Sequence, residues 1–436
     1  MDLENIIFCI VFIGFLILFI INFRKILFNI KLGRKIDRSD NSAARWKNMI
    51  RIALGQSKMI RRPVAGIFHI IIYLGFIIIN IEMIEILFDG IFGTHRSLLY
   101  ILPSSLYNLL ISVFEILAFL VILACIVFLA RRNILKIKRF WSREMTSWPR
   151  NDANLILIFE VFLMFAFLFM NASDLVLQHK GYIDTITGEF LLSIYLTPFI
   201  NHFSIESLIF LERFCWWFHI IGVLLFMNYI LISKHLHIFF AFPSTYYANL
   251  KPLGQFNNLE SVTNEVKLML DPNADPYSVS PKTIDTGVFG AKDATDLNWV
   301  QLLNSYSCTE CGRCTSNCPA NQTGKLLSPR KILMDTRKRI TEIGRNIRNN
   351  NNDNKSLLGD YITSEELWAC TSCNACNESC PIDLDPLSII LDMRRFLVME
   401  QSAAPSELNM MFSNIENNGA PWQFSPADRL NWKDEK

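Results

Sequence analysis

One cysteine spacing occurs twice in this chain of 436 residues and takes up eight of its 11 cysteines. Each copy reads Cys-x2-Cys-x2-Cys-x3-Cys-Pro, and the two copies begin at Cys308 and Cys370. This spacing holds [4Fe-4S] clusters in two-cluster ferredoxins, where the fourth cysteine of each copy binds the other cluster. The sequence therefore predicts two [4Fe-4S] clusters. The expected ligand sets are Cys308, Cys311, Cys314 and Cys380 for the first cluster, and Cys370, Cys373, Cys376 and Cys318 for the second.

Two other uses of paired cysteines fit this pattern less well. Structural zinc sites also contain Cys-x2-Cys pairs, but they take four ligands and usually lack the trailing Cys-Pro. Disulfides belong to oxidising compartments, whereas closely spaced thiols that bind iron need a reducing one. We therefore expect the cysteine-rich part of the chain to face the cytoplasm.

Five apolar stretches are long enough to cross a bilayer. They lie near residues 4–23, 64–87, 107–130, 154–172 and 214–234. The first is preceded by no basic segment and followed by no cleavage site, so we interpret it as a retained helix. Hydrophobic residues make up 51% of the chain and charged residues 19%, which requires segregated apolar and polar regions. The expected fold is all-α, with a five-helix transmembrane bundle followed by an α-helical ferredoxin domain.

The positions of lysine and arginine predict how the bundle is oriented. Basic residues are dense in the connection at 24–62 and again after the third stretch, and such loops are usually cytoplasmic. The connections after the second and fourth stretches hold few, for example Arg96 and Lys180. The sequence thus predicts a multi-pass protein of the cell inner (cytoplasmic) membrane, with its amino terminus outside and its cluster domain on the cytoplasmic side.

Two histidines are expected to lie at one depth in this bundle. His69 is near the cytoplasmic end of the second stretch and His237 is near that of the fifth. Two facing imidazoles form a b-type haem site, and ionisable residues inside membranes are usually functional. The alternative is that His69 is only packed and that His237 caps a helix. His219 is 18 residues before His237, on the same face of one continuous helix, whereas His235 is expected to point elsewhere.

A second haem would need a partner for His219, and the matching position in the second stretch is Ile79. We therefore expect one haem b, unless His202 or His179 binds a second one with His219. Glu82, Glu85 and Glu115 also fall in the outer half of the membrane. With His219 they either handle protons at a quinone site or simply reach the interface and are solvated.

The membrane part resembles the gamma subunit of respiratory nitrate reductase. The resemblance covers residues 1–245 and is carried by the stretch Gly66-Ile67-Phe68-His69 and by the pair Phe218-His219 and His237-Ile238. It implies that His69 and His237 bind the haem nearer the clusters and that the bundle exchanges electrons with menaquinol. The second histidine of that family in this helix is Ile79 here.

Residues 246–297 are expected to be a linker, 298–400 a dicluster ferredoxin domain and 401–436 a C-terminal tail. Each cysteine motif leads into a helix, because Ser328-Pro329 and Asp385-Pro386 combine a capping residue with proline at the first helical position. These helices are expected to run to Ile340 and Leu397, with a loop at 349–352 between them. Basic residues at 330–339 form either a solvated helix face or a dock for an acidic partner.

This soluble part resembles the ferredoxin module of heterodisulfide-reductase-type iron-sulfur oxidoreductases. The matching segments are residues 311–314, 323–330, 393–395 and 420–422. In long members of that family, cysteine-rich CCG domains follow and carry the chemistry. This sequence ends at Lys436 without them, so the resemblance implies an oxidoreductase subunit whose catalytic partner is another chain.

Three functions are consistent with these features. The first is an electron-transfer subunit that connects the menaquinone pool, haem b and two clusters with a soluble CCG-type partner. The second is a quinone reductase that accepts electrons from electron-transfer flavoprotein or a flavin dehydrogenase. The third is a non-enzymatic membrane redox sensor without haem. We expect contact with membrane lipid and none with nucleic acid, and no Gly-x-Gly-x-x-Gly follows a strand to indicate nucleotide binding.

Overall fold

The structure is a computed structural model that describes residues 3–183, 188, 190–273 and 288–434. Helices are the only regular secondary structure among these residues, and two isolated β-bridges join Arg34 to Asn298 and Leu358 to Ile362. The predicted all-α fold is therefore confirmed. Part of the predicted linker, residues 274–287, lies outside the described residues.

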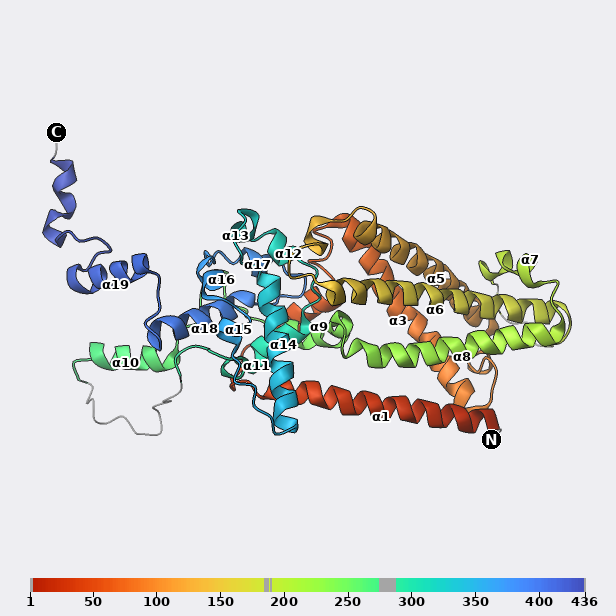
Figure 1. Ribbon diagram of the computed structural model, residues 1–436. Coiled ribbons are helices and arrows are strands. Elements are labelled where there is room, and N and C mark those ends of the chain that lie inside the picture. The colour runs from red at the N-terminus through yellow and green to blue at the C-terminus, as the bar shows by residue number, and fades with distance from the viewer. Residues whose placement is uncertain (1–2, 184–187, 189, 274–287, 435–436) are drawn as a thin grey trace.

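Five long helices are apolar enough to cross a membrane, and each contains most of one predicted stretch. They are α1 (Leu3–Lys31), α3 (Pro63–Phe92), α5 (Ser104–Asn133), α6 (Ser147–His179) and α8 (Ile205–Ile230). Helix α6 packs against both α5 and α8, while α3 packs against α5 (Figure 1). Helix α1 lies along one side of this bundle and leaves apolar side chains such as Ile10 and Ile13 exposed, as expected of a helix that faces lipid.

The fifth helix ends earlier than the sequence predicts. Helix α8 stops at Ile230, and a separate helix α9 (His237–Tyr246) begins after the short 3-10 turn Lys234–Leu236. The hydroxyl of Ser233 accepts a hydrogen bond from the backbone N–H of His235, and Asp152 accepts one from that of Lys234. These side-chain acceptors replace the carbonyl groups that a continuing helix would offer. The expectation that His219 and His237 share one face of a continuous helix is therefore wrong.

Shorter elements connect the long helices at both ends of the bundle. They are α2 (Ser42–Met49), the π-helical turn Ile50–Leu54, α4 (Leu98–Ile101), the 3-10 turns Lys138–Phe140 and Ser193–Tyr195, and α7 (Thr197–Ile200). Helix α10 (Glu260–Leu270) lies in the segment between α9 and the C-terminal helices. Helix α2 packs against α9 at the end of the bundle nearest the C-terminal helices.

The C-terminal region is a cluster of mostly short helices. In order they are the 3-10 turn Ala294–Asp296, α11 (Trp299–Ser307), α12 (Arg313–Ser316), α13 (Pro319–Gln322), α14 (Pro329–Arg348), α15 (Leu357–Asp360), α16 (Ser364–Trp368), α17 (Ala375–Ser379), α18 (Pro386–Met399), α19 (Ser406–Asn418) and the 3-10 helix Pro426–Lys433. Helices α14 and α18 begin where the sequence predicts. The side chain of Ser328 accepts a hydrogen bond from Lys331 N–H, and that of Asp385 accepts one from Ser388 N–H.

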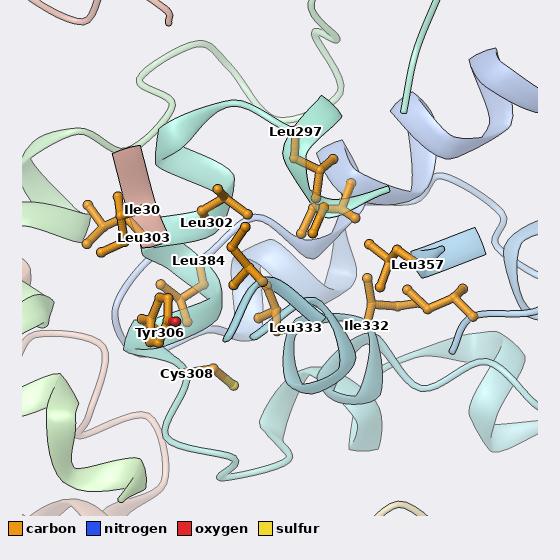
Figure 2. Close-up of a cluster of buried hydrophobic side chains, with 14 of the residues drawn as sticks. Ile30, Leu297, Leu302, Leu303, Tyr306, Cys308, Ile332, Leu333, Leu357 and Leu384 are labelled. Carbon is orange, nitrogen blue, oxygen red and sulfur yellow. The ribbon is translucent and has the colours of Figure 1, made fainter. Parts of the chain in front are cut away.

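One hydrophobic core joins the membrane helices to the C-terminal helices. Figure 2 shows Ile30 of α1 beside Leu303 of α11, with Tyr306, Leu333 and Cys308 in the same cluster. Asn29 of α1 donates a hydrogen bond of 2.8 Å to the hydroxyl of Tyr306. The cysteine motifs are therefore held against the end of the bundle by buried contacts.

Candidate redox centres

The first predicted set of cysteines lines one cavity. Its walls include Cys308, Cys311 and Cys314 of the first motif and Cys380 of the second. The apolar side chains of Leu333 and Leu384 and the ring of Pro386 enclose these thiols. The chain has thus brought four cysteines from two distant segments to one cavity.

A glycine shapes the loop that carries these thiols. Gly312 lies between Cys311 and the short helix α12 with a φ of +69°, a conformation that L side chains rarely adopt. A Cβ atom at this position would also lie 2.5 Å from the guanidinium of Arg330. Only glycine therefore allows the loop to turn tightly against α14.

The two motifs pair in a symmetric way. Asn317 and Ser379 precede the fourth cysteines of their motifs, and Asn317 Nδ2 donates a hydrogen bond of 2.7 Å to Ser379 Oγ. Helices α12 and α17, each within one motif, pack against each other. This pairing brings Cys318 towards the second motif and Cys380 towards the first.

Burial raises the pKa of cysteines in both expected ligand sets. Burial, followed by the nearby Cys370 and Cys373 thiols, raises the pKa of Cys318, although backbone N–H groups lower it in part. Burial raises the pKa of Cys308 to about 11 and that of Cys380 to about 12. The protein alone therefore favours protonated thiols here, so the positive charge of bound iron would be needed to keep them as thiolates.

Two histidines face each other between α3 and α9. The ring centroids of His69 and His237 are 6.5 Å apart, with an angle of 40° between the planes. A metal between two imidazoles, with bonds of about 2.0 Å on opposite sides, separates such centroids by roughly 6 Å. His237 Nδ1 lies 3.2 Å from the carbonyl oxygen of Lys234, which places the proton on Nδ1 and leaves Nε2 as the free ligand atom. His69 and His237 could therefore hold a haem iron between them.

His69 and His235 add two details to this site. The Nδ1 atom of His69 is buried and has no hydrogen-bond partner among the residues that the structure describes. His235 does not point elsewhere as expected, because its ring centroid is 5.7 Å from that of His237. The chain changes direction after α8, so that the rings of His235 and His237 lie beside each other.

His219 is in a different environment. It is buried in α8, its Nδ1 lies 3.1 Å from the carbonyl oxygen of Leu163, and its ring contacts that of Phe167. Ile79 is buried as well, while the ring of His202 contacts that of Phe203. Of the ring contacts made by the described part of the chain, none joins His219 to another histidine.

The three membrane glutamates are not solvated. Glu82, Glu85 and Glu115 are all buried, so the interpretation that they simply reach the interface is wrong. Glu82 and Glu85 lie near Arg96, which is in the predicted loop but is buried, and Asn171 links Arg96 to Glu115. Sequence reasoning missed this guanidinium because its partners come from distant helices.

Basic residues of α14 have internal roles that the sequence did not reveal. Arg330 is fully buried and forms an ion pair of 2.6 Å with Glu144, a residue of the connection between α5 and α6. Arg339 is buried and pairs with Asp293 and Asp353. Arg330 and Arg339 therefore form neither a solvated helix face nor a docking site for an acidic partner, whereas Lys338 is exposed.

Comparison with known proteins places these features in a family context. Residues 304–384 match the family model described as a 4Fe-4S dicluster domain. A probable iron-sulfur-binding oxidoreductase of Bacillus subtilis, FadF, is 28% identical over 93% of this chain and 57% of its own length. The EtfAB:quinone oxidoreductase of Syntrophomonas wolfei is 27% identical over 92% of this chain and 56% of its own length. One component of the ferredoxin/F(420)H(2)-dependent CoB-CoM heterodisulfide reductase of Methanosarcina acetivorans is 35% identical over 24% of this chain and 52% of its own length.

The chain spans a little over half the length of the two long relatives. No solved structure matches it. The predicted resemblance to heterodisulfide-reductase-type iron-sulfur oxidoreductases is confirmed by these relatives and by the matching domain. The chain is therefore a homologue of iron-sulfur-binding oxidoreductases, with five apolar helices followed by a 4Fe-4S dicluster domain.

Proposed function

We propose that this chain is a membrane electron-transfer subunit that connects the menaquinone pool, one haem b and two [4Fe-4S] clusters with a soluble redox partner. The observation that carries the proposal is the facing pair His69 and His237, 6.5 Å apart between ring centroids, at the end of the bundle that holds the cysteine motifs. When bound, a haem and two clusters supply one-electron transfer. The residues described below hold, orient and enclose them.

The proposed cluster ligands are the two crossed sets of cysteines. Cys308, Cys311, Cys314 and Cys380 would hold the first cluster, and Cys370, Cys373, Cys376 and Cys318 the second. The first four cysteines line one cavity, which supports the first set. The thiols of Cys370 and Cys373 contribute to the raised pKa of Cys318, which supports the second set. Apolar side chains around the first set exclude water, which is one of the factors that tune cluster potentials.

His69 and His237 are the proposed haem ligands. The carbonyl of Lys234 would fix the orientation and tautomer of His237, as carbonyl partners of metal-bound histidines commonly do. His219 would remain a buried histidine bonded to Leu163, which supports one haem rather than two.

The location of the protein is proposed from its helices and its basic loops. The five apolar helices support a multi-pass membrane protein. We propose the cell inner membrane, with the cluster domain on the cytoplasmic side, because the basic connections lie at the end of the bundle next to that domain. The boundaries at residues 245, 297 and 400 are our proposed division into membrane domain, linker, cluster domain and tail.

Two kinds of soluble partner are consistent with the proposed electron-transfer function. A separate CCG-domain protein is supported by the matching component of a heterodisulfide reductase. Electron-transfer flavoprotein is supported by the name of a relative that matches over 92% of this chain, EtfAB:quinone oxidoreductase. With the flavoprotein as donor, electrons would run through the clusters to quinone; with a CCG partner as acceptor, they would run the other way.

Quantifying haem and iron in anaerobically purified protein tests this proposal. We expect one b-type haem and about eight non-haem irons per chain, as two cubane clusters imply. The variant His69→Ala should lose the haem and keep the iron, while the control His202→Ala should keep both. Iron without haem in the unmodified protein would contradict the quinone-linked function and favour a redox sensor.

A further inference from the structure

A buried charged cluster lies at the end of the bundle away from the cysteine motifs. It contains Glu82 and Glu85 of α3, Glu115 of α5, Asp174 of α6 and Arg96 of the connection between α3 and α4. None of these side chains belongs to the proposed haem or cluster sites. Each residue is at most 5% exposed. Glu82, Glu85 and Asp174 thus lie near one guanidinium inside the apolar bundle, and Asn171 links Glu115 to it.

Three of the four carboxyl groups have good hydrogen-bond donors. Glu115 accepts from Asn171 Nδ2 at 3.1 Å, from Leu192 N–H at 2.8 Å and from Ser193. Asp174 accepts from Arg96 Nε at 2.9 Å. Glu85 accepts from Leu98 N–H at 2.9 Å and from the hydroxyl of Tyr107 at 3.3 Å. Donors of this kind stabilise the ionised form of a carboxyl group.

Glu82 lacks such donors. Its Oε1 atom is 3.7 Å from Arg96 Nη1, beyond hydrogen-bond distance, and its Oε2 atom is buried with no partner among the described residues. The single guanidinium is already bonded to Asp174 through Nε and to Asn171 through Nη2. A buried carboxylate without a hydrogen-bond donor is unfavourable, and such groups take a proton instead.

The charged neighbours of Glu82 further favour its protonated form. The other titratable or charged groups that face it are Glu85 and Asp89 of α3, Glu115 and Tyr107 of α5, and Arg96. Helix α8 contributes Arg213, which pairs with its neighbour Glu212. The carboxylates next to Glu82 therefore outnumber the one cation that reaches it.

The cluster comes close to the surface at one point. Arg96 lies between Glu82 and Asp174. The second oxygen of Asp174, Oδ1, has no hydrogen-bond partner among the described residues and is 3.8 Å from His95 Nε2, and 44% of the His95 side chain is exposed. Because a guanidinium does not release its proton, Arg96 separates Glu82 from this point of the surface.

We propose that Glu82 is a proton-binding site that holds its proton at neutral pH, at the end of the membrane domain distal to the cysteine motifs. This inference goes beyond the proposed electron-transfer function, since it rests on the charge balance of the bundle and not on any haem or cluster. The site would hold a proton inside the membrane domain on the side opposite its cluster domain.

Infrared spectroscopy of the full chain in nanodiscs tests the protonation directly. The probe is the proton itself, followed by the carbonyl stretch of a protonated carboxyl group at neutral pH and by its shift in D2O. In the difference spectrum between the unmodified protein and Glu82→Gln we expect one such band, and we expect none in the difference spectrum for the control Glu206→Gln, which changes an exposed glutamate of α8. Absence of the difference band for Glu82→Gln would overturn the proposal.

A further variant protects the test against misfolding. Glu82→Asp keeps a carboxyl group, so the band should shift but remain, and its absence from this variant would overturn the proposal. Haem and iron contents of each variant are measured alongside, so that a failure of the electron-transfer proposal is distinguished from a failure of this one.

Discussion

Lys234 and Glu310 form a buried ion pair in which Lys234 Nζ lies 2.8 Å from Glu310 Oε2. Lys234 is 7% exposed and Glu310 is 5% exposed. Glu310 stands between Cys308 and Cys311, while the carbonyl of Lys234 contacts His237 Nδ1. One ion pair thus connects the loop of the first proposed cluster with the segment that positions a proposed haem ligand.

Removing this lysine should loosen that connection. In Lys234→Met, Glu310 keeps Arg337 as its one ion-pair partner among the described residues. Breaking a buried pair costs about 3–5 kcal/mol when the remaining charge has no other partner, and the remaining arginine should reduce that cost to about 2 kcal/mol. We expect lower thermal stability and altered electron paramagnetic resonance signals of the first cluster. The exposed Lys338→Met on α14 is the matched control, and equal behaviour of the two variants would contradict this role.

Cysteine double variants test the crossed ligand sets. Because Cys308 and Cys380 are expected to bind the same cluster, Cys308→Ala combined with Cys380→Ala should leave the second cluster and about four irons. Cys370→Ala combined with Cys380→Ala should remove ligands from both clusters. Iron quantification and electron paramagnetic resonance distinguish these results. If each motif instead bound its own cluster, the second combination would retain about four irons and the first would retain none.

Contact between the cluster domain and the membrane domain should weaken in acid. Burial by itself would raise the pKa of Glu144, but the Arg330 guanidinium and the Ser328 hydroxyl together hold that pKa below its usual value. A carboxyl whose pKa is depressed by folding stabilises the fold fully above its unfolded pKa of about 4.3 and loses this effect as the pH falls through the folded value.

The pH dependence of thermal unfolding should therefore change in Glu144→Gln. We expect the unmodified protein to lose stability more steeply below about pH 5 than the variant does. At neutral pH the variant should be less stable, because Arg330 keeps no charged partner within the ion pairs of the described residues. Parallel pH profiles for the two proteins would show that Glu144 does not contribute in this way.

Much of this architecture could be predicted because local patterns determine it. Apolar length marks each membrane helix, and Ser328 and Asp385 mark the starts of α14 and α18 through their side-chain caps. The cysteine spacing also implies that distant segments meet, since no single motif supplies four ligands to one cluster.

Other features depend on contacts between residues far apart in the sequence. The helix break before His237 requires Asp152 of α6 to accept from Lys234 N–H, and nothing near Lys234 in the sequence signals that bond. The burial of the loop residue Arg96 could not be predicted, because its partners Asp174 and Asn171 are on α6. Such pairs become visible only when the helices are packed together.

The optical spectrum of the anaerobically purified protein, before and after addition of a menaquinol analogue, tests the central claim most directly. We predict b-type haem bands that become reduced when the quinol is added, and no such bands in His69→Ala or His237→Ala. If the protein contains about eight irons but shows no haem bands before or after the quinol is added, quinone-linked electron transfer through a haem is contradicted.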